Sequence, residues 1–140
     1  MLFREALLPL VVQVALIFGL LFWMGGARVG AIRRREVRMA DIAITQSNWP
    51  PGIQQIANCY GNQFQLPVLY LVLTALVMIL RKADIVFVVL AWVFVLSRVV
   101  HAAIHTTGND VQLRFYAFLF GAVVLLMMWI IFAAQALIGV

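Results

Sequence analysis

The sequence predicts an all-α integral membrane protein, a bundle of four transmembrane helices in a single domain over residues 1–140. Two observations lead to this fold class. Hydrophobic residues make up 66% of the chain and charged residues only 11%, against about 45–50% and about 25% in soluble domains. The apolar residues also form four long stretches, and about 20 such residues cross a hydrocarbon core of about 30 Å. A short water-soluble fold could not bury that much apolar surface.

The first predicted span covers residues 6–27 and contains Pro9 and Gln13, with Gly25-Gly26 expected to end it. A cleaved signal peptide is the competing interpretation. Its apolar core is usually about 7–15 residues long, shorter than this stretch, and its leading positive charge would be cancelled here, since Glu5 follows Arg4. We therefore expect a retained transmembrane helix.

Residues 28–52 form a long polar connection, which ends in Trp49-Pro50-Pro51-Gly52. The two prolines stop any preceding helix and can open the next one at its first turn. Trp49 suits the membrane interface. The net charge of +5 raises the question of nucleic acid, but the basic residues flank apolar segments. Anionic lipid headgroups and membrane topology explain them better, so no nucleic-acid partner is expected.

The other three predicted spans cover residues 53–80, 84–105 and 111–137. The second begins with polar residues outside the hydrocarbon and enters it as one helix. The connection between spans one and two holds five arginines, and the opposite side holds Arg4, Arg81 and Lys82. Positive charge stays in the cytoplasm, so that connection should be cytoplasmic and both termini outside or lumenal. The membrane would be the cytoplasmic (inner) membrane or the endoplasmic reticulum.

Polar residues of three spans meet at the cytoplasmic level in this topology. One helix face carries Gln55, Asn58, Asn62 and Gln65, a second carries Arg98, His101, His105 and Asn109, and the fourth span opens with Gln112 and Arg114. Intramembrane polar residues normally face the bundle interior or a water-filled cavity. We expect a solvated polar pocket between the helices; hydrogen bonds that only hold the helices together are the alternative.

Two arginines are the most informative residues of this pocket. Arg98 lies 14 residues after Asp84, about 21 Å along a helix and short of the far edge of the hydrocarbon. Snorkelling accounts for Arg98 alone, but not for the amides and histidines at the same level. Arg114 opposes the dipole of its own helix at a cost of about 0.3–1 kcal/mol. Such a site favours an anion: a ligand carboxylate or thiolate, or a lipid phosphate.

Histidine and cysteine do not predict a metal site or a disulfide. His101 and His105 have the i, i+4 spacing of metal ligands, but no cysteine or carboxylate lies on that helix face to complete a site. Cys59 is the only cysteine and therefore cannot form an intramolecular disulfide. It is expected to be a small buried thiol.

These segments resemble a bacterial-type member of the MAPEG family, the membrane-associated proteins in eicosanoid and glutathione metabolism. The resemblance covers most of the chain: the basic connection, Ala57-Asn58, Asn62-Gln63-Phe64-Gln65-Leu66-Pro67, Arg98-Val99-Val100-His101 and Gln112-Leu113-Arg114. It implies a homotrimer of four-helix subunits with cytosol-facing glutathione sites between neighbouring subunits. Membrane lipids and hydrophobic small molecules would be its other partners.

The resemblance also implies roles for individual residues. Arg114 matches the family arginine that stabilises the glutathione thiolate, and would be the catalytic residue. An ordinary thiol has a pKa near about 8.5, which a neighbouring cation lowers. The glutathione-binding residues would be Asn58, Asn62, Gln65, Arg98, His101 and His105. The thiolate would then attack a lipophilic electrophile that arrives through the bilayer.

This sequence departs from the family pattern at several positions. Gln54 stands where family enzymes commonly have an arginine, four residues before Asn58, and Gln63 and Gln65 lie where they have an acid. Two functions therefore fit: a glutathione-dependent transferase or peroxidase, or a non-enzymatic lipid-binding or accessory membrane protein of the same fold. A small multidrug transporter fits worse, because it expects a glutamate within span one, where this chain has only Gln13.

The predicted orientation can be tested with a cysteine in place of Arg35. A membrane-impermeant thiol reagent added to intact cells should leave this cysteine unlabelled, because five basic residues hold the connection in the cytoplasm. Labelling from outside would overturn the assignment.

Overall fold

The computed structural model describes residues 2–45 and 48–139, and every regular element in these residues is a helix. The helices are α1 (Phe3–Arg33), α2 (Met39–Ile42), α3 (Pro51–Asn62), α4 (Leu66–Ile79), α5 (Ile85–Thr106) and α6 (Val111–Leu137). Four segments in this part of the chain are long and apolar enough to cross a membrane: α1, α3 with α4, α5, and α6. The predicted all-α membrane bundle is confirmed.

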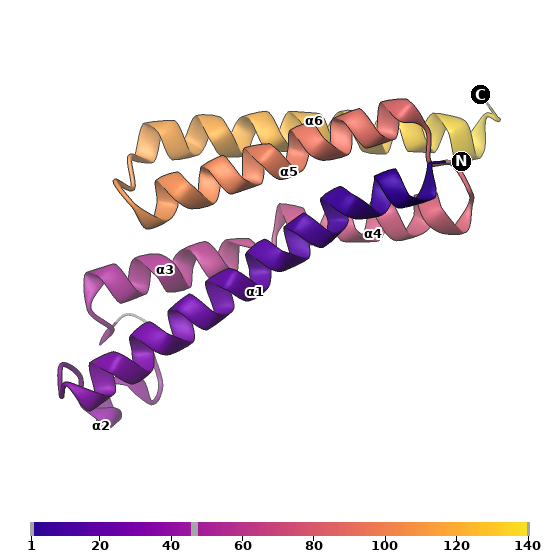
Figure 1. The fold of residues 1–140 in the computed structure, drawn as a ribbon. Helices are drawn as coiled ribbons and strands as arrows, with labels where there is room; N and C mark the ends of the chain where they lie inside the picture. The colour runs from indigo at the N-terminus through magenta and orange to yellow at the C-terminus, as the bar shows by residue number, and fades with distance from the viewer. Residues whose placement is uncertain (1, 46–47, 140) are drawn as a thin grey trace.

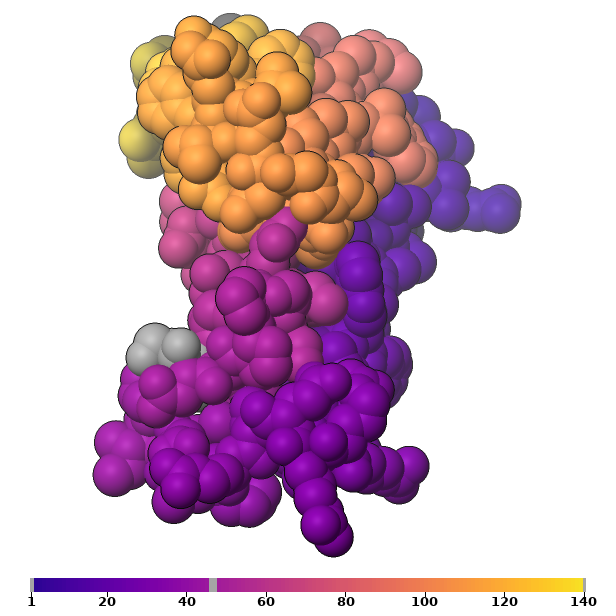
Figure 2. Space-filling model, turned by 90° about the vertical axis from the view of Figure 1, so that its left-hand side faces the viewer, coloured from indigo at the N-terminus to yellow at the C-terminus, as the bar shows by residue number. Residues whose placement is uncertain are grey.

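The helices form two pairs that diverge toward one end. Figure 1 shows the α5–α6 hairpin on one side, with α1 running beside α3 and α4 on the other. Both termini lie at the end where the pairs meet. Figure 2 looks onto the opposite end, where the α5–α6 turn, in orange, stands above α3 and the polar connection.

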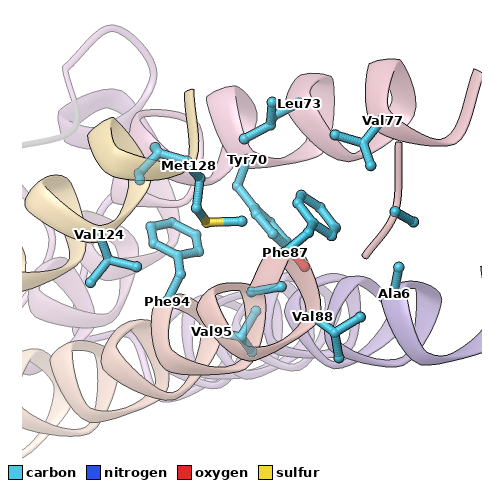
Figure 3. Close-up of a cluster of buried hydrophobic side chains, with 13 residues drawn as sticks. Ala6, Tyr70, Leu73, Val77, Phe87, Val88, Phe94, Val95, Val124 and Met128 are labelled. Atoms are coloured by element: carbon cyan, nitrogen blue, oxygen red, sulfur yellow. The ribbon is translucent and has the colours of Figure 1, made fainter. Parts of the chain in front are cut away.

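The end that bears the termini is closed by apolar packing and by polar contacts. Tyr70 of α4 and Phe94 of α5 pack with their ring centres 5.0 Å apart, beside Met128 of α6 (Figure 3). The buried hydrophobic cluster is Ala6, Tyr70, Leu73, Val77, Ala83, Phe87, Val88, Ala91, Phe94, Val95, Val124, Leu125 and Met128. Asp84 caps α5 by accepting a hydrogen bond from Phe87 N at 2.8 Å, and Gln135 Nε2 donates to it at 3.1 Å. The main apolar core thus lies toward the end that bears the termini.

The expectation that Gly25-Gly26 ends the first helix is wrong, because α1 continues to Arg33. Glycine costs a helix only about 1 kcal/mol relative to alanine, and the residues that follow are packed. Ala31 is buried against Trp49, over whose ring the Arg28 guanidinium lies at 4.8 Å. Trp49 is therefore held inside the protein. With 31 residues, α1 is about 46 Å long and exceeds the hydrocarbon core.

The second span is interrupted, contrary to the expectation of one continuous helix. α3 ends at Asn62 and α4 begins at Leu66. Between them, short i to i+3 bonds replace helical ones: Gln63, Phe64 and Gln65 donate from their backbone N–H groups to the third residue before each. Pro67 contributes to the break, because it lacks an N–H and so cannot donate a helical hydrogen bond back to the carbonyl of Gln63. Asn62 and Gln65 therefore flank a break and do not share one regular helix face.

Close approach of α5 and α6 depends on Gly121. A Cβ atom at this position would lie 2.9 Å from Ser97 Oγ. Ser97 is held in place because its hydroxyl donates to Phe94 O at 2.6 Å. Small residues at helix crossings allow this kind of backbone approach in membranes.

Gly121→Ala should lower the stability of the protein by about 1–3 kcal/mol, since the added methyl group clashes with the fixed Ser97 hydroxyl. Thermal unfolding in detergent measures the effect. Adding Ser97→Ala should restore most of the loss by removing the clashing oxygen. Gly26→Ala is the matched control, because nothing lies within 4 Å of its added Cβ. An unchanged melting temperature in Gly121→Ala would contradict the close packing.

Candidate functional site

Two adjoining hollows lie between α3, α5 and the start of α6. The polar hollow has a volume of about 530 Å³ and is lined by Ala57, Asn58, Gly61, Asn62, Gln65, His105 and Arg114. The aromatic hollow has a volume of about 230 Å³ and is lined by Asn62, His101, Val111, Arg114, Phe115 and Phe118. Asn62 and Arg114 belong to both. Seven residues have a catalytic or glutathione-binding role by the family resemblance; six of them line one or both hollows, and the seventh, Arg98, contacts Asn62.

Arg98 is a fully buried cation on α5, with 0% of its surface exposed. Its Nη2 donates a hydrogen bond to Asn62 Oδ1, and Asn62 Nδ2 donates to Gln65 Oε1 at 3.3 Å. Among the described residues, Nε and Nη1 of Arg98 have no hydrogen-bond partner. A buried guanidinium without a carboxylate is costly to the fold. Arg98 therefore places two strong, unused donors beside the break between α3 and α4.

Arg114 lies in the first turn of α6 and is half-buried. Its Nη1 donates to Asn109 Oδ1 at 2.7 Å. The backbone donors of this helix end are already used, because Asp110 Oδ1 accepts from Gln112 N at 3.0 Å and from Leu113 N at 3.1 Å. An anion at this place would thus meet the Arg114 guanidinium and not the bare helix end.

The polar residues predicted to share one face of α3 make two different kinds of contact. Asn58 is exposed toward the polar hollow, and its Oδ1 accepts from Gln54 Nε2 at 2.7 Å. Gln55 instead reaches across to α5, where its Nε2 donates to His105 O at 2.7 Å and Thr107 O at 3.0 Å. These are carbonyls at the end of a helix, which lack intrahelical donors. Gln55 therefore joins α3 to the end of α5, whereas Asn58 lines the polar hollow.

The two histidines face different hollows. His105 lines the polar one and His101 the aromatic one, with their ring centres 5.6 Å apart in an edge-to-face arrangement. The His101 ring also lies 6.1 Å from Phe118. In residues 2–45 and 48–139, no three histidine, cysteine or acidic side chains gather where a metal ion could bind. The two histidines thus line the hollows, one on each.

Gln13 is a residue whose importance the sequence analysis missed. It is fully buried in α1, and its Nε2 donates to Gln63 Oε1 at 3.0 Å. Gln63, also fully buried, donates to Cys59 O at 3.2 Å. This pair ties α1 to the residues where α3 breaks, directly beside Asn62. The available signal was a single amide in an otherwise apolar span, which demands a polar partner.

Comparison with known proteins gives one match. The family model described as MAPEG family matches residues 6–134, a range that holds every residue of the two hollows. No curated protein matches the chain, and neither does any solved structure.

Gln13→Leu should reduce stability by about 1 kcal/mol, a typical value for a hydrogen bond between membrane helices. The substitution leaves Gln63 Oε1 buried without its donor. Thermal unfolding in detergent measures the loss. Gln112→Leu makes the same change at an exposed position and should have little effect. Equal melting temperatures for wild type and Gln13→Leu would show that this amide pair does not hold the break.

Proposed function

Because the chain belongs to the MAPEG family, we propose that it binds glutathione in the polar hollow and uses it on hydrophobic compounds, as a transferase or peroxidase. The observation that supports this most is the position of Arg114, which borders both the polar and the aromatic hollow. A reaction between a polar thiol peptide and an apolar molecule needs a polar and an apolar binding site that adjoin each other. The reacting atoms have to meet beside a group that stabilises negative charge.

The polar hollow suits the charged groups of the peptide. The amide groups of Asn58 and Gln65 line it together with the Arg114 guanidinium, and Arg98 lies next to it in contact with Asn62. Hydrogen bonds from a guanidinium to a carboxylate are among the stronger ones in proteins. In this proposal Arg98, Asn58 and Gln65 orient the peptide, with Asn62 fixing the position of Arg98.

The aromatic hollow suits an apolar partner. Val111, Phe115 and Phe118 give it an apolar wall, and Phe115 is 56% exposed at the surface of α6. A hydrophobic molecule dissolved in the bilayer could reach this wall without passing through water. It would come to lie on the other side of Arg114 from the peptide.

Arg114 stabilises the negative sulfur once the thiol has lost its proton to water. The bound peptide supplies the nucleophile: in transfer, a carbon–sulfur bond forms to the electrophilic carbon and the bond to its leaving group breaks. Asn109 holds the Arg114 guanidinium at 2.7 Å, so the cation needs little rearrangement when the charge develops.

The proposal includes a homotrimer whose hollows open toward the cytoplasm. Asn58 and Gln65 are exposed in a single subunit although they lie on a span. An amide group in contact with lipid has no hydrogen-bond partner there, which would reduce the stability of the protein by an amount on the order of several kcal/mol. A neighbouring subunit covering α3 would remove that contact and complete the site.

Lipid binding without catalysis is the second candidate. The Arg114 guanidinium, which lines both hollows, favours it, because a guanidinium also binds phosphate in a bidentate manner. Such a protein would use the same two hollows for a headgroup and the start of its acyl chain.

Arg114→Ala should weaken glutathione binding or turnover about tenfold to a hundredfold, since a hydrogen bond to a charged group contributes about 1.5–3 kcal/mol. Folding should change far less, because the arginine opposes its own helix dipole. Arg114→Lys should keep part of the effect, because a charge remains without the forked geometry. The measurement is the melting temperature in detergent with and without millimolar glutathione.

Arg4→Ala is the matched control, since it removes an exposed arginine at the other end of the bundle. It should leave the ligand-induced shift unchanged. A wild type that shows no shift with glutathione would contradict the thiol-dependent function and favour lipid binding.

A further inference from the structure

The polar connection contains a hollow of its own, which we call the loop hollow. It has a volume of about 380 Å³ and is lined by Arg35, Glu36, Val37, Arg38, Asp41 and Asn48. Figures 1 and 2 show the connection on the far side of α3 from the α5–α6 turn. The loop hollow is therefore separate from the polar and aromatic hollows, which lie between α3, α5 and α6.

The length of α1 places the loop hollow at the level of the lipid headgroups. The helix has 31 residues and is about 46 Å long, whereas a bilayer with its headgroups is about 40–45 Å thick. It begins at the end that bears the termini and runs obliquely past α5 (Figure 1). Its last turn therefore lies in the headgroup layer on the predicted cytoplasmic side, and the loop hollow follows it directly.

Arg35 is the arginine of the loop hollow whose charge no acid balances. Arg34 pairs with Glu36 at 2.8 Å, and Arg38 pairs with Asp41 at 3.0 Å. The hydrogen bond from Arg34 lowers the pKa of Glu36, so this acid stays ionised beside its partner. Arg35 is exposed, and no carboxylate among the described residues pairs with it. The three arginines and two acids thus leave one positive charge, on Arg35.

The backbone of Arg35 adopts a conformation that normally belongs to glycine. Its φ is 57°, in the left-handed region where a Cβ atom is crowded. The residue closes α1 in a Schellman motif, because Arg35 N donates to Ile32 O at 3.1 Å and Glu36 N to Ala31 O at 3.0 Å. The helix dipole favours a cation near this end, but Arg34 supplies one at a φ of −81°. A ligand for the side chain would explain an arginine at this strained position.

Apolar side chains of the connection favour a lipid over a soluble ligand. Ile44 is 97% exposed, and Met39 in α2 is 65% exposed. Both residues lie outside the spans. A basic segment that also exposes apolar side chains is typical of a surface at the membrane interface, where the apolar groups enter the boundary between headgroups and acyl chains.

We propose that the loop hollow binds the headgroup of an anionic phospholipid, with the Arg35 guanidinium hydrogen-bonded to the phosphate. A guanidinium can hold two phosphate oxygens through parallel hydrogen bonds. This site goes beyond the proposed glutathione function, because it lies outside both hollows that serve that function. A bound lipid would hold the end of α1 at the surface of the bilayer.

The test follows the melting temperature of the full chain in a non-ionic detergent while phosphatidylglycerol is titrated into the micelles. Arg35→Gly removes the charge and gives this position the residue that its backbone favours. Without lipid, the variant should melt at the wild-type temperature or higher. Phosphatidylglycerol should stabilise the wild type, and Arg35→Gly should bind it about tenfold more weakly, because a hydrogen bond to a charged group is lost.

Arg81→Gly is the matched control. Arg81 is exposed and has a φ of 54°. It closes α4 in the same motif, because Arg81 N donates to Met78 O at 3.2 Å and Lys82 N to Val77 O at 2.9 Å. The substitution removes the same charge and the same backbone strain at the other end of the bundle, away from the loop hollow. Arg81→Gly should therefore keep the wild-type affinity for phosphatidylglycerol.

Four results would overturn the proposal. Equal weakening in the two variants would show a diffuse effect of net charge without a site. A lower melting temperature of Arg35→Gly already without lipid would show that this arginine holds the fold or a neighbouring subunit. Inorganic phosphate that stabilises the wild type as much as phosphatidylglycerol would identify a soluble anion as the ligand. A wild type that phosphatidylglycerol does not stabilise would exclude the site.

Discussion

The polar end of the bundle depends on the hydrogen bond from Arg98 to Asn62. It joins α5 to the end of α3 and places a guanidinium at full burial within a segment that crosses the membrane. A charge in that position must face protein or water, so it forces the surrounding helices to supply polar groups. Asn62 can supply one because the chain breaks immediately after it, and the break is in turn tied to α1 through Gln63 and Gln13.

The two ends of the molecule are held together by different contacts. At the end that bears the termini, rings and methyl groups fill the space between all the helices, and Asp84 and Gln135 lock the hairpin. At the opposite end the two helix pairs diverge (Figure 1), and the contacts between them are a small apolar cluster of Leu20, Cys59 and Ala102 and hydrogen bonds such as Gln55 to the end of α5. Stability is thus concentrated in one half, which allows the other half to carry exposed polar groups and hollows.

The sequence was sufficient to predict the fold class, because apolar stretch length and composition decide how a chain meets a bilayer. It also identified Asn62 and Arg98 as close neighbours in depth, since their helical positions could be counted from the span ends. It did not predict that α1 passes Gly25-Gly26, because packing of Ala31 and Trp49 outweighs the weak intrinsic preference of glycine. Nor did it predict that Gln55 bonds to α5 while Asn58 lines the polar hollow. Residues three positions apart on a helix point in similar but not identical directions, so they can contact different neighbours.

Both ends of the described chain, residues 2 and 139, lie at the closed end of the bundle, away from the hollows (Figure 1). Whatever is joined to either end, such as an affinity tag, a fluorescent reporter or a further domain, begins across the thickness of the bilayer from Arg114. Such an attachment can be long and bulky without covering the two hollows. It can also be cut off or immobilised on a support while the hollows remain open to the solution.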